Sequence, residues 1–434
     1  MNQELTSIKR RLLVVLIGLV VFRLGSHVPV PGIDLAALTE LFNQHQSGLL
    51  GLFNVFSGGS LSRFSIFALG VMPYISASII MQLGSSSFPK LMQLKKEGDR
   101  GQQVINRYTR YLSLIIALVQ GFGVCRWLKA QQVIAPEFGL LFLVVVVVTL
   151  AAGTLFLIWL GEQLTDHGIG NGVSLIICSG IIVRLPEACH SLLDQFRQGQ
   201  LQGVTLIIIA LIIALVVYGI IYFEKGQRQI RVNYARRQHG QKMSGGSSSH
   251  LPLKLNMSGV IPPIFASAII LLPATIANFY GVHDGWLGKV LLNVSRWLSP
   301  GHWSYSVLFA AAIFFFSYFY QSIVFNPQDT ANQLKKSGAL VPGVRPGSQT
   351  ADYIRNTMDR LTIFGSIYLC LVCLVPQIMI DWFHVSFYFG GTSLLIVIVV
   401  VMDLMTQVQS QLMAMKYRSL MKQSSGNKGQ FNLF

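Results

Sequence analysis

Charged side chains are scarce in this chain, and acidic ones are the scarcest. Asp, Glu, Lys and Arg make up 12% of the 434 residues, with 17 acidic against 33 basic residues. A soluble domain usually carries about 25% charged residues. Apolar residues make up 52%, in runs such as LLFLVVVVVTL at 140–150 that a large soluble protein with an apolar core does not explain. The composition therefore indicates a polytopic membrane protein.

Cysteine is also rare. The five cysteines are odd in number and lie mostly inside apolar runs, which makes a disulfide framework a poor explanation for them. Cys370 and Cys373 have the spacing of a redox or metal pair, but they lie in an expected membrane span. We expect them to pack there as small apolar side chains.

The motifs of common enzymes are missing. The chain has no GxxxxGK[ST], no HExxH and no nucleophile elbow, and its nine histidines are scattered, mostly in loops. We expect no enzyme activity, no catalytic residue, no metal site and no cofactor. Ion-coupled transporters place ionisable groups inside their spans, and the candidates here are few: Arg23, Arg184 and Asp403. A secondary transporter of a small solute stays open as the alternative function, and a structural scaffold as a third.

Apolar runs, merged where glycine or proline interrupts them, predict ten spans. The first follows a basic cluster with no small-residue cleavage site after it, so we expect no cleavable signal peptide. The second and fifth are the least well defined of the ten. The expected limits are 12–32, 64–86, 111–128, 138–160, 172–190, 203–223, 258–280, 305–325, 361–382 and 387–409.

Basic residues predict the orientation. Most of the 33 Lys and Arg fall in alternate connections, in the N-terminal segment and in the C-terminal tail. The positive-inside rule then puts both termini in the cytoplasm. The spans divide five and five around a long basic loop at 224–256, which suggests inverted halves, although no persuasive sequence repeat supports this.

The stretch 53–83 is apolar but broken. Gly58, Gly59, Gly70 and Pro73 interrupt it, and Arg63 is its one charge. A span needs about 20 apolar residues, so 53–67 is too short and too interrupted to be one. A short segment at membrane depth needs protein around it or a water-filled cavity. The rest of the chain must then build that cavity.

Two cytoplasmic connections are long and basic. Residues 224–256 carry seven basic residues against one acidic, and alternation from Gln229 to Tyr234 predicts a hairpin strand. In 326–360, a helix should begin at Asn326 and Pro327 and end at Gly338. The sharp turn that follows should expose Arg345. Such protrusions either solvate the loops or bind an acidic partner, a nucleoprotein surface or a soluble motor protein.

Isoleucines recur near the middle of several spans, but isoleucine in an apolar helix most often contacts lipid or a neighbouring helix. Spacing alone does not establish a narrow apolar ring, although such a ring would block ions by dewetting. The positions are Ile75, Ile79, Ile177, Ile181, Ile264 and Ile396.

Ordered motifs along essentially the whole chain resemble the bacterial SecY family, the channel subunits of the Sec protein-conducting translocon. They are FRLGS at 22–26, VPVPGID at 28–34, FNVFSGG at 53–59, MPYISASI at 72–79, KKEG at 95–98, WLGEQ at 159–163, GIGNG at 168–172, VNYA at 232–235, PLK at 252–254, GVIP at 259–262, FNP at 325–327, KKSG at 335–338, VPGVRPG at 341–347 and FYFGGTS at 387–393.

The resemblance implies an all-α membrane protein. Its ten transmembrane helices would form two inverted pseudo-symmetric halves around an hourglass pore, with a short re-entrant plug helix. The halves would be residues 1–190 and 203–410, followed by a cytoplasmic tail at 411–434. A lateral gate would open between the second and third and the seventh and eighth spans.

The resemblance also implies site residues. The six isoleucines above would form the pore ring. The plug segment, residues 53–67, would include Phe53, Asn54, Phe56, Gly58, Gly59, Arg63 and Phe67, with Arg63 facing the aqueous outer funnel. Docking of SecA or the ribosome would use Arg228, Arg231, Arg236, Arg237 and Arg345. Gln229 departs from the family pattern, in which a second basic residue tends to follow Arg228.

The implied function is passage of unfolded secretory polypeptides across the bacterial inner membrane, with sideways release of transmembrane segments into lipid. The energy would come from SecA or from a bound ribosome. The implied partners are the small membrane subunits SecE and SecG, the SecA ATPase, the ribosome, signal sequences, nascent chains and membrane lipids.

Overall fold

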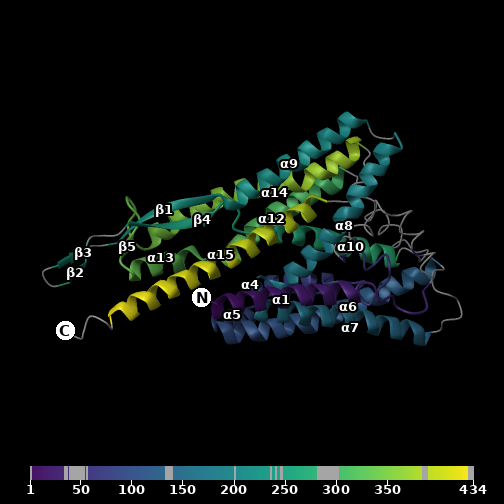
Figure 1. The fold of residues 1–434 in the computed structure, drawn as a ribbon, viewed down its shortest axis with the longest axis horizontal. Helices are drawn as coiled ribbons and strands as arrows, with labels where there is room; N and C mark the ends of the chain where they lie inside the picture. The colour runs from purple at the N-terminus through teal and green to yellow at the C-terminus, as the bar shows by residue number, and fades with distance from the viewer. Residues whose placement is uncertain are drawn as a thin grey trace. The chain divides into compact units, whose positions relative to one another are not determined.

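Two compact units make up the fold. The computed structural model describes residues 2–33, 38, 54, 57–131, 140–199, 202–234, 237–239, 242–244, 248–280, 303–383 and 390–428, which are mainly helical (Figure 1). The first unit comprises 1–194, 271–300 and 396–434, and the second comprises 195–270 and 301–395.

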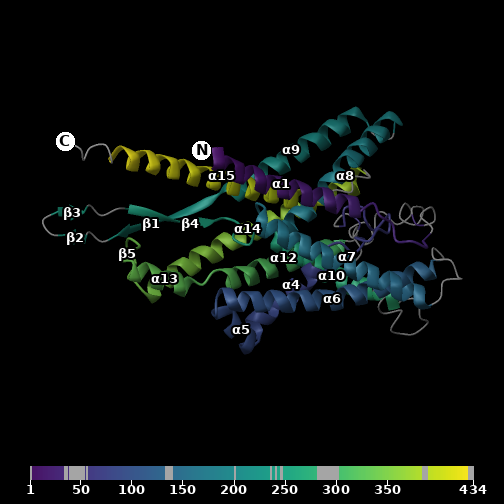
Figure 2. The same ribbon diagram turned by 60° about the horizontal axis from the view of Figure 1, so that its bottom comes forward.

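The first unit is built from long helices. Its helix α6 packs against both α4 and α7, and α1 packs against α7 (Figure 2). The helices that contribute to this unit are α1 (Asn2–Gly25), α4 (Met72–Ser87), α5 (Pro89–Lys96), α6 (Asp99–Ala130), α7 (Leu140–His167), α8 (Gly172–Arg197) and most of α15 (Gly391–Lys428).

Part of the chain before α4 helps to form the core of the first unit. Leu61, Phe64 and Leu69 are buried in one apolar cluster with Ala117 of α6 and Leu150 of α7. Burying apolar side chains stabilises a fold by about 25 cal/mol per Å². This segment is therefore attached to α6 and α7 by ordinary core packing.

Glycines let α7 and α8 meet closely. A β-carbon on Gly172 would stand 2.0 Å from the carbonyl oxygen of Gly161. Thr165 fastens the joint, since its hydroxyl donates to the Gly161 carbonyl at 2.8 Å and accepts from the Gly172 amide at 2.8 Å. The glycine-rich connection at 161–172, called the glycine joint below, is thus a tight helix–helix turn.

A small sheet distinguishes the second unit. Strand β1 (Gln227–Tyr234) lies between β4 (Ser248–Lys254) and the two-residue β5 (Ala339–Leu340), antiparallel to both. Beyond it, β2 (Arg237–His239) pairs with β3 (Lys242–Ser244). The prediction of a hairpin strand from alternation in 229–234 is confirmed.

Helices pack beside this sheet within the second unit. Ile230 of β1 and Leu253 of β4 share an apolar cluster with Ile354 and Met358 of α14. The helix α14 also packs against α9, α12 and α13. The helices of this unit are α9 (Gly203–Lys225), the first part of α10 (Ile261–Tyr280), α12 (Trp303–Val324), α13 (Pro327–Lys336) and α14 (Ser348–Phe383).

Seven helices among the described residues are long and apolar enough to cross a membrane. They lie within Asp99–Lys129, Leu141–His167, Gly172–Arg197, Gly203–Lys225, Trp303–Lys336, Ser348–Met379 and Gly391–Tyr417. The other three expected spans fall on α1, α4 and α10, and their crossing stays a prediction.

The second expected span begins later than the sequence suggested. Residues 57–71 are mostly turns, and α4 starts only at Met72 with Pro73 in its first turn. Gly70 has a φ of +57°, a conformation that ends helical structure and that glycine adopts without strain. The predicted start of the second span at residue 64 was therefore wrong, because the helix begins about two turns later.

Candidate pore-lining site and plug segment

The predicted pore-lining isoleucines lie on four helices. Ile75 and Ile79 are one turn apart on α4, and Ile177 and Ile181 are one turn apart on α8. These four and Ile396 of α15 are at most 8% exposed, whereas Ile264 of α10 is partly buried. Ile264 belongs to the second unit and the other five to the first. Convergence of all six on one ring stays a prediction.

The described part of the plug segment, Asn54 and residues 57–67, is folded on itself by its own polar groups. The Asn54 side chain accepts from the Ser62 amide at 3.1 Å, and its carbonyl accepts from the Gly59 amide at 2.9 Å. The Ser57 hydroxyl accepts from the Leu61 amide at 3.2 Å. The segment is a compact series of turns from Ser57 onward. Phe53 and Phe56 lie outside the described residues.

Backbone bonds attach the plug segment to the chain that follows α1. The Val30 amide donates to the Phe64 carbonyl at 2.9 Å, and the Ile66 amide donates to the Val28 carbonyl at 3.1 Å. Pro29 and Ser65 form an isolated antiparallel bridge between these bonds. Two segments more than thirty residues apart are thus joined as a minimal two-stranded ladder.

An aromatic stack holds the end of the plug segment. Phe67 stacks on Phe22 of α1 and on Phe156 of α7, with ring centroids 6.2 and 5.8 Å apart. Gly25 makes room for it, because a β-carbon there would stand 2.0 Å from the Phe67 ring. Aromatic pairs of this kind add about 0.5–1.5 kcal/mol beyond the area that they bury.

Gly58 seats the plug segment on α8. A β-carbon on Gly58 would stand 2.8 Å from the α-carbon of Gly180, and Gly58 has a φ of +67°. Gly180 directly precedes Ile181, and Ile177 lies one turn before that. The plug segment and one predicted pore-lining pair are therefore neighbours within the first unit.

Three basic side chains gather where α1 meets the plug segment. The Arg63 guanidinium donates to Nε2 of His27 at 2.7 Å, and the Arg23 guanidinium donates to the Gly58 carbonyl at 3.4 Å. His27 Nδ1 lies 2.9 Å from the Arg23 carbonyl oxygen. Arg63 is exposed and Arg23 partly buried. Arg63 is thus on the surface, and its location in an outer funnel stays a prediction.

Two serine hydroxyls of the plug segment are buried without a partner. Ser60 and Ser65 are fully buried, and neither Oγ has a hydrogen-bond partner among the described residues. A buried unpaired hydroxyl costs about 1–3 kcal/mol. The two buried hydroxyls therefore offset part of the free energy that the apolar contacts of the plug segment contribute to its packing.

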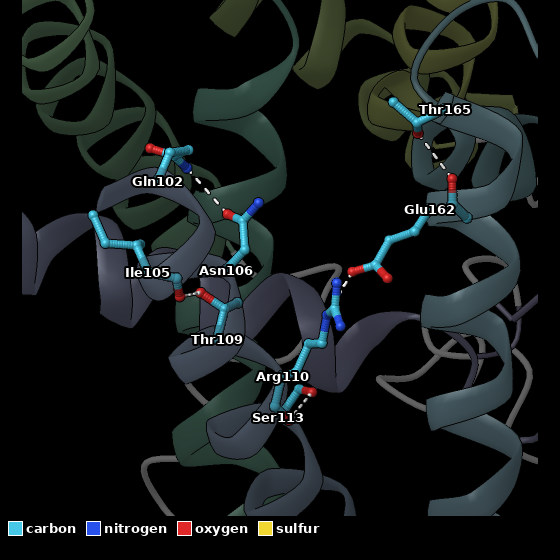
Figure 3. A network of polar contacts seen from close by, with 9 residues as sticks. Gln102, Ile105, Asn106, Thr109, Arg110, Ser113, Glu162 and Thr165 are labelled. Carbon is cyan, nitrogen blue, oxygen red and sulfur yellow. Dashed lines mark hydrogen bonds and ion pairs between the residues drawn. The ribbon is translucent and has the colours of Figure 1, made fainter. Parts of the chain in front are cut away.

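An ion pair joins α6 to α7 (Figure 3). Arg110 Nε donates to Glu162 Oε1 at 2.7 Å, with both side chains pointing toward each other across the gap between the helices. Both are partly exposed, so the pair contributes about 0–1 kcal/mol. Glu162 follows Gly161 of the glycine joint, so the pair joins α6 to α7 close to the α7–α8 turn.

The basic residues predicted for docking lie in the second unit. Arg228 and Arg231 are exposed on β1, opposite Leu253 and His250 of β4. Arg237 begins β2, and Arg236 lies outside the described residues. The β5 strand, which pairs with β1, directly precedes the turn that holds Arg345.

Arg345 is exposed, as predicted, in the turn between β5 and α14. Its carbonyl accepts from the Thr350 hydroxyl at 2.8 Å, so the first turn of α14 fixes the backbone beneath it. Before β5, the Asn326 side chain caps α13 by accepting from the Gln328 amide at 3.1 Å. The expected helix after Asn326 and the exposed Arg345 are both confirmed.

Sequence comparison adds the family. The SecY family profile matches residues 65–405. The protein translocase subunit SecY of Escherichia coli K12 is 50% identical over 426 residues, covering 97% of this chain and 95% of that protein. The chain belongs to the SecY family. The family resemblance read from the motifs is confirmed.

Solved structures agree in fold with this SecY-family chain. A SecY structure, whose plug domain is described as stabilising the closed state and maintaining a membrane seal, aligns with a TM-score of 0.66 at 18% identity. It covers 93% of this chain, and the alignment covers 92% of that one. Canine Sec61 in a ribosome–channel complex aligns with a TM-score of 0.59 at 18% identity and with the same coverage.

Sequence reasoning missed several contacts in this SecY-family member. In the sequence, His27 is one of nine scattered histidines, and Arg23 is notable only as an ionisable residue within an expected span. The structure joins both to the plug segment. The bond between Arg63 and His27 spans 36 positions, and no local pattern signals it. Gly180 was also missed, because a glycine in an apolar helix has many possible uses.

Proposed function

We propose that this chain is the channel subunit of a Sec-type protein translocase. It passes unfolded secretory polypeptides through a central pore and releases transmembrane segments sideways into lipid. It has no enzyme activity of its own. The observation that carries this proposal is the 50% identity to Escherichia coli SecY over nearly the full length of both chains.

The proposed topology has ten spans with both termini in the cytoplasm of a bacterium and the spans in its inner membrane. Seven helices meet the length and apolarity of a span among the described residues. The basic connections supply the orientation by the positive-inside rule. In this orientation the end of α1 near Ser26 and the plug segment lie toward the outer face.

The plug segment closes the resting pore in this proposal, and the six isoleucines line its narrowest ring. The contact of Gly58 with Gly180, beside Ile181, supports it. An apolar ring excludes ions by dewetting when no polypeptide fills it. The hydroxyls of Ser60 and Ser65, which have no partner among the described residues, offset part of the stability that packing gives the plug segment, as a reversible closure requires.

Energy comes from outside the chain, from SecA or from a translating ribosome. The exposed arginines of β1 and the Arg345 turn are the proposed docking surface, because β1 and β5 join the two basic connections in one sheet. SecE and SecG are the proposed membrane partners, with signal sequences, nascent chains and lipids as further contacts.

A secondary transporter of a small solute is the rival function. It would require a polar midplane site, which the buried isoleucines do not provide. The test is translocation by vesicles that contain the chain with its SecE and SecG partners, supplied with SecA and ATP. Protease protection of a secretory protein supports the proposal, and solute uptake without such protection contradicts it.

A further inference from the structure

The chain between β4 and α10 is short and packed into the core of the second unit. We call residues 255–260 the link. Leu255 and Met257 of the link pack against the apolar cluster that β1, β4 and α14 share. Asn256 lies between them and is only 4% exposed. Because core side chains are closely packed with their neighbours, this part of the link moves with the sheet and α14 rather than as a free linker.

The side-chain amide of Asn256 joins the end of α9 to the start of α10. It donates to Oε1 of Glu224 at 2.7 Å and to the Gly259 carbonyl at 3.1 Å. A carboxylate and a carbonyl only accept hydrogen bonds, so the amide nitrogen must face both of them. Glu224 lies in the last turn of α9, and α10 begins at Ile261. One buried amide therefore bonds to the last turn of one helix and to the turn that precedes the next.

The proposed docking surface packs on the same apolar cluster as the link. Val344, directly before Arg345, packs against the cluster that Leu255 contacts. The ladder between β1 and β4 also continues into the link, because the Leu255 amide donates to the Gly226 carbonyl at 3.0 Å. Packed side chains and backbone bonds thus form an unbroken path from the docking surface to Asn256.

The helix α14 contacts the same region. A β-carbon on Gly365 of α14 would stand 3.0 Å from the Leu255 carbonyl oxygen. Tyr368 lies about one turn further along α14 and stacks on Phe223, with ring centroids 4.6 Å apart. Phe223 directly precedes Glu224. The end of α9, the sheet and α14 therefore form one packed block, and Asn256 bonds this block to the turn before α10.

We propose that Asn256 is a positioning residue that couples the docking surface to α10. Binding of the motor protein at β1, β5 and the Arg345 turn then shifts α10 as well. This inference rests on the proposed function. Ile264, one of the proposed ring residues, lies in the first turn of α10, so a shift of that turn moves the ring.

The turn before α10 shows why the amide is needed. Gly259 lies in this turn with a φ of +59°. Glycine has more backbone freedom than any other residue, so a turn that contains it bends easily. Such bending would absorb a displacement of the sheet before it reached α10. Asn256 opposes the bending, because it holds the carbonyl of this same glycine.

The test uses the full chain with its SecE and SecG partners in vesicles. Two quantities are measured: the affinity of SecA for the vesicles, and the rate at which a secretory protein is translocated at saturating SecA. Asn256→Asp keeps the shape of the side chain, removes both donors and places a second carboxylate beside Glu224. We expect an unchanged affinity and a translocation rate about fivefold lower, the lower end of ordinary coupling between two sites. Asn256→Ala should show the same split.

Asn326→Ala is the matched control for the loss of a structural asparagine. The Asn326 side chain accepts from the Gln328 amide at 3.1 Å and donates to Asp329 at 2.8 Å, so its bonds lie within the start of α13. This variant should keep both the affinity and the rate. A fall in rate as large as that of Asn256→Asp would show that lost stability, rather than lost coupling, is responsible, and would overturn the role of Asn256.

A further variant separates this inference from the proposed function. Arg228→Glu combined with Arg231→Glu reverses two charges on the proposed docking surface and should weaken SecA binding. Unchanged binding overturns the proposed docking surface and this inference with it. Weakened binding there, together with a wild-type rate in Asn256→Asp, overturns the role of Asn256 alone. So does an Asn256→Asp complex that binds SecA more weakly but translocates normally at saturation, because Asn256 would then support docking itself.

Discussion

Gly58 and Gly180 are in backbone contact, and a β-carbon on Gly58 would stand 2.8 Å from the α-carbon of Gly180. The first residue belongs to the plug segment and the second to α8, next to Ile181. Glycine–glycine contacts let two backbones approach as closely as side chains normally forbid. Two residues without side chains thus allow the plug segment to pack directly against the backbone of α8.

Gly58→Ala should unseat the plug segment and raise the resting ion conductance of the reconstituted channel. Gly59→Ala is the matched control, since Gly59 also has a positive φ, +81°, but no described residue lies within 4 Å of its β-carbon position. Both variants carry the backbone strain, and only Gly58→Ala carries the collision. Equal conductance in the two would show that strain, rather than the contact with Gly180, matters.

Ser65→Ala should hold the plug segment more firmly. The substitution removes a buried hydroxyl that has no partner among the described residues, a gain of about 1 kcal/mol or about fivefold in the closed-to-open ratio. The measurement is the frequency of spontaneous openings in planar bilayers. The control is Ser62→Ala, which removes a hydroxyl that donates to the Gly59 carbonyl at 2.9 Å. This variant should not lower the frequency of openings. More openings in Ser65→Ala would contradict this interpretation.

Arg345→Glu should spare membrane insertion of the protein and abolish SecA-driven secretion. The residue is exposed in a turn that β5 and α14 fix in place, so the change reverses a surface charge without disturbing packing. Arg355→Glu, at an exposed position on α14, is the control for charge alone and should secrete normally. Export assays in cells depleted of the native subunit measure both, and normal export by Arg345→Glu would exclude this turn as a docking site.

Ile79→Ser should admit secretory proteins with defective signal sequences, because a polar residue in an apolar ring lowers the cost of opening it. Ile396→Ser should do the same. Ile80→Ser is the control, since Ile80 is 46% exposed and Ile79 3% exposed on the same helix. Unchanged selectivity and conductance in Ile79→Ser and Ile396→Ser would remove both residues from the ring.

Local patterns in the sequence predicted local structure well. Alternation located β1, Asn326 with Pro327 located the start of α13, and the glycines and prolines of 341–347 located the exposed Arg345. Each of these depends on residues a few positions apart. Composition and motifs alone also indicate the membrane class and the family.

Contacts between distant segments could not be predicted in this way. The pairing of β5 with β1, the seat of Gly58 on Gly180 and the bond from Arg63 to His27 depend on how helices and turns pack. The start of α4 was misplaced for a similar reason. The apolar run from 64 to 71 indicates a span by hydropathy, whereas tertiary contacts with α6 and α7 hold much of it in turns.

The most direct test of the proposed channel places a photocrosslinking residue at position 79 and, in a second variant, at position 264, with position 80 as the control. A secretory chain is arrested partway through translocation in the complete complex and irradiated. We predict crosslinks to the arrested chain from positions 79 and 264, and few from 80. Labelling of 79 and 264 by a small solute, with no crosslink to the arrested chain, would contradict a protein-conducting pore.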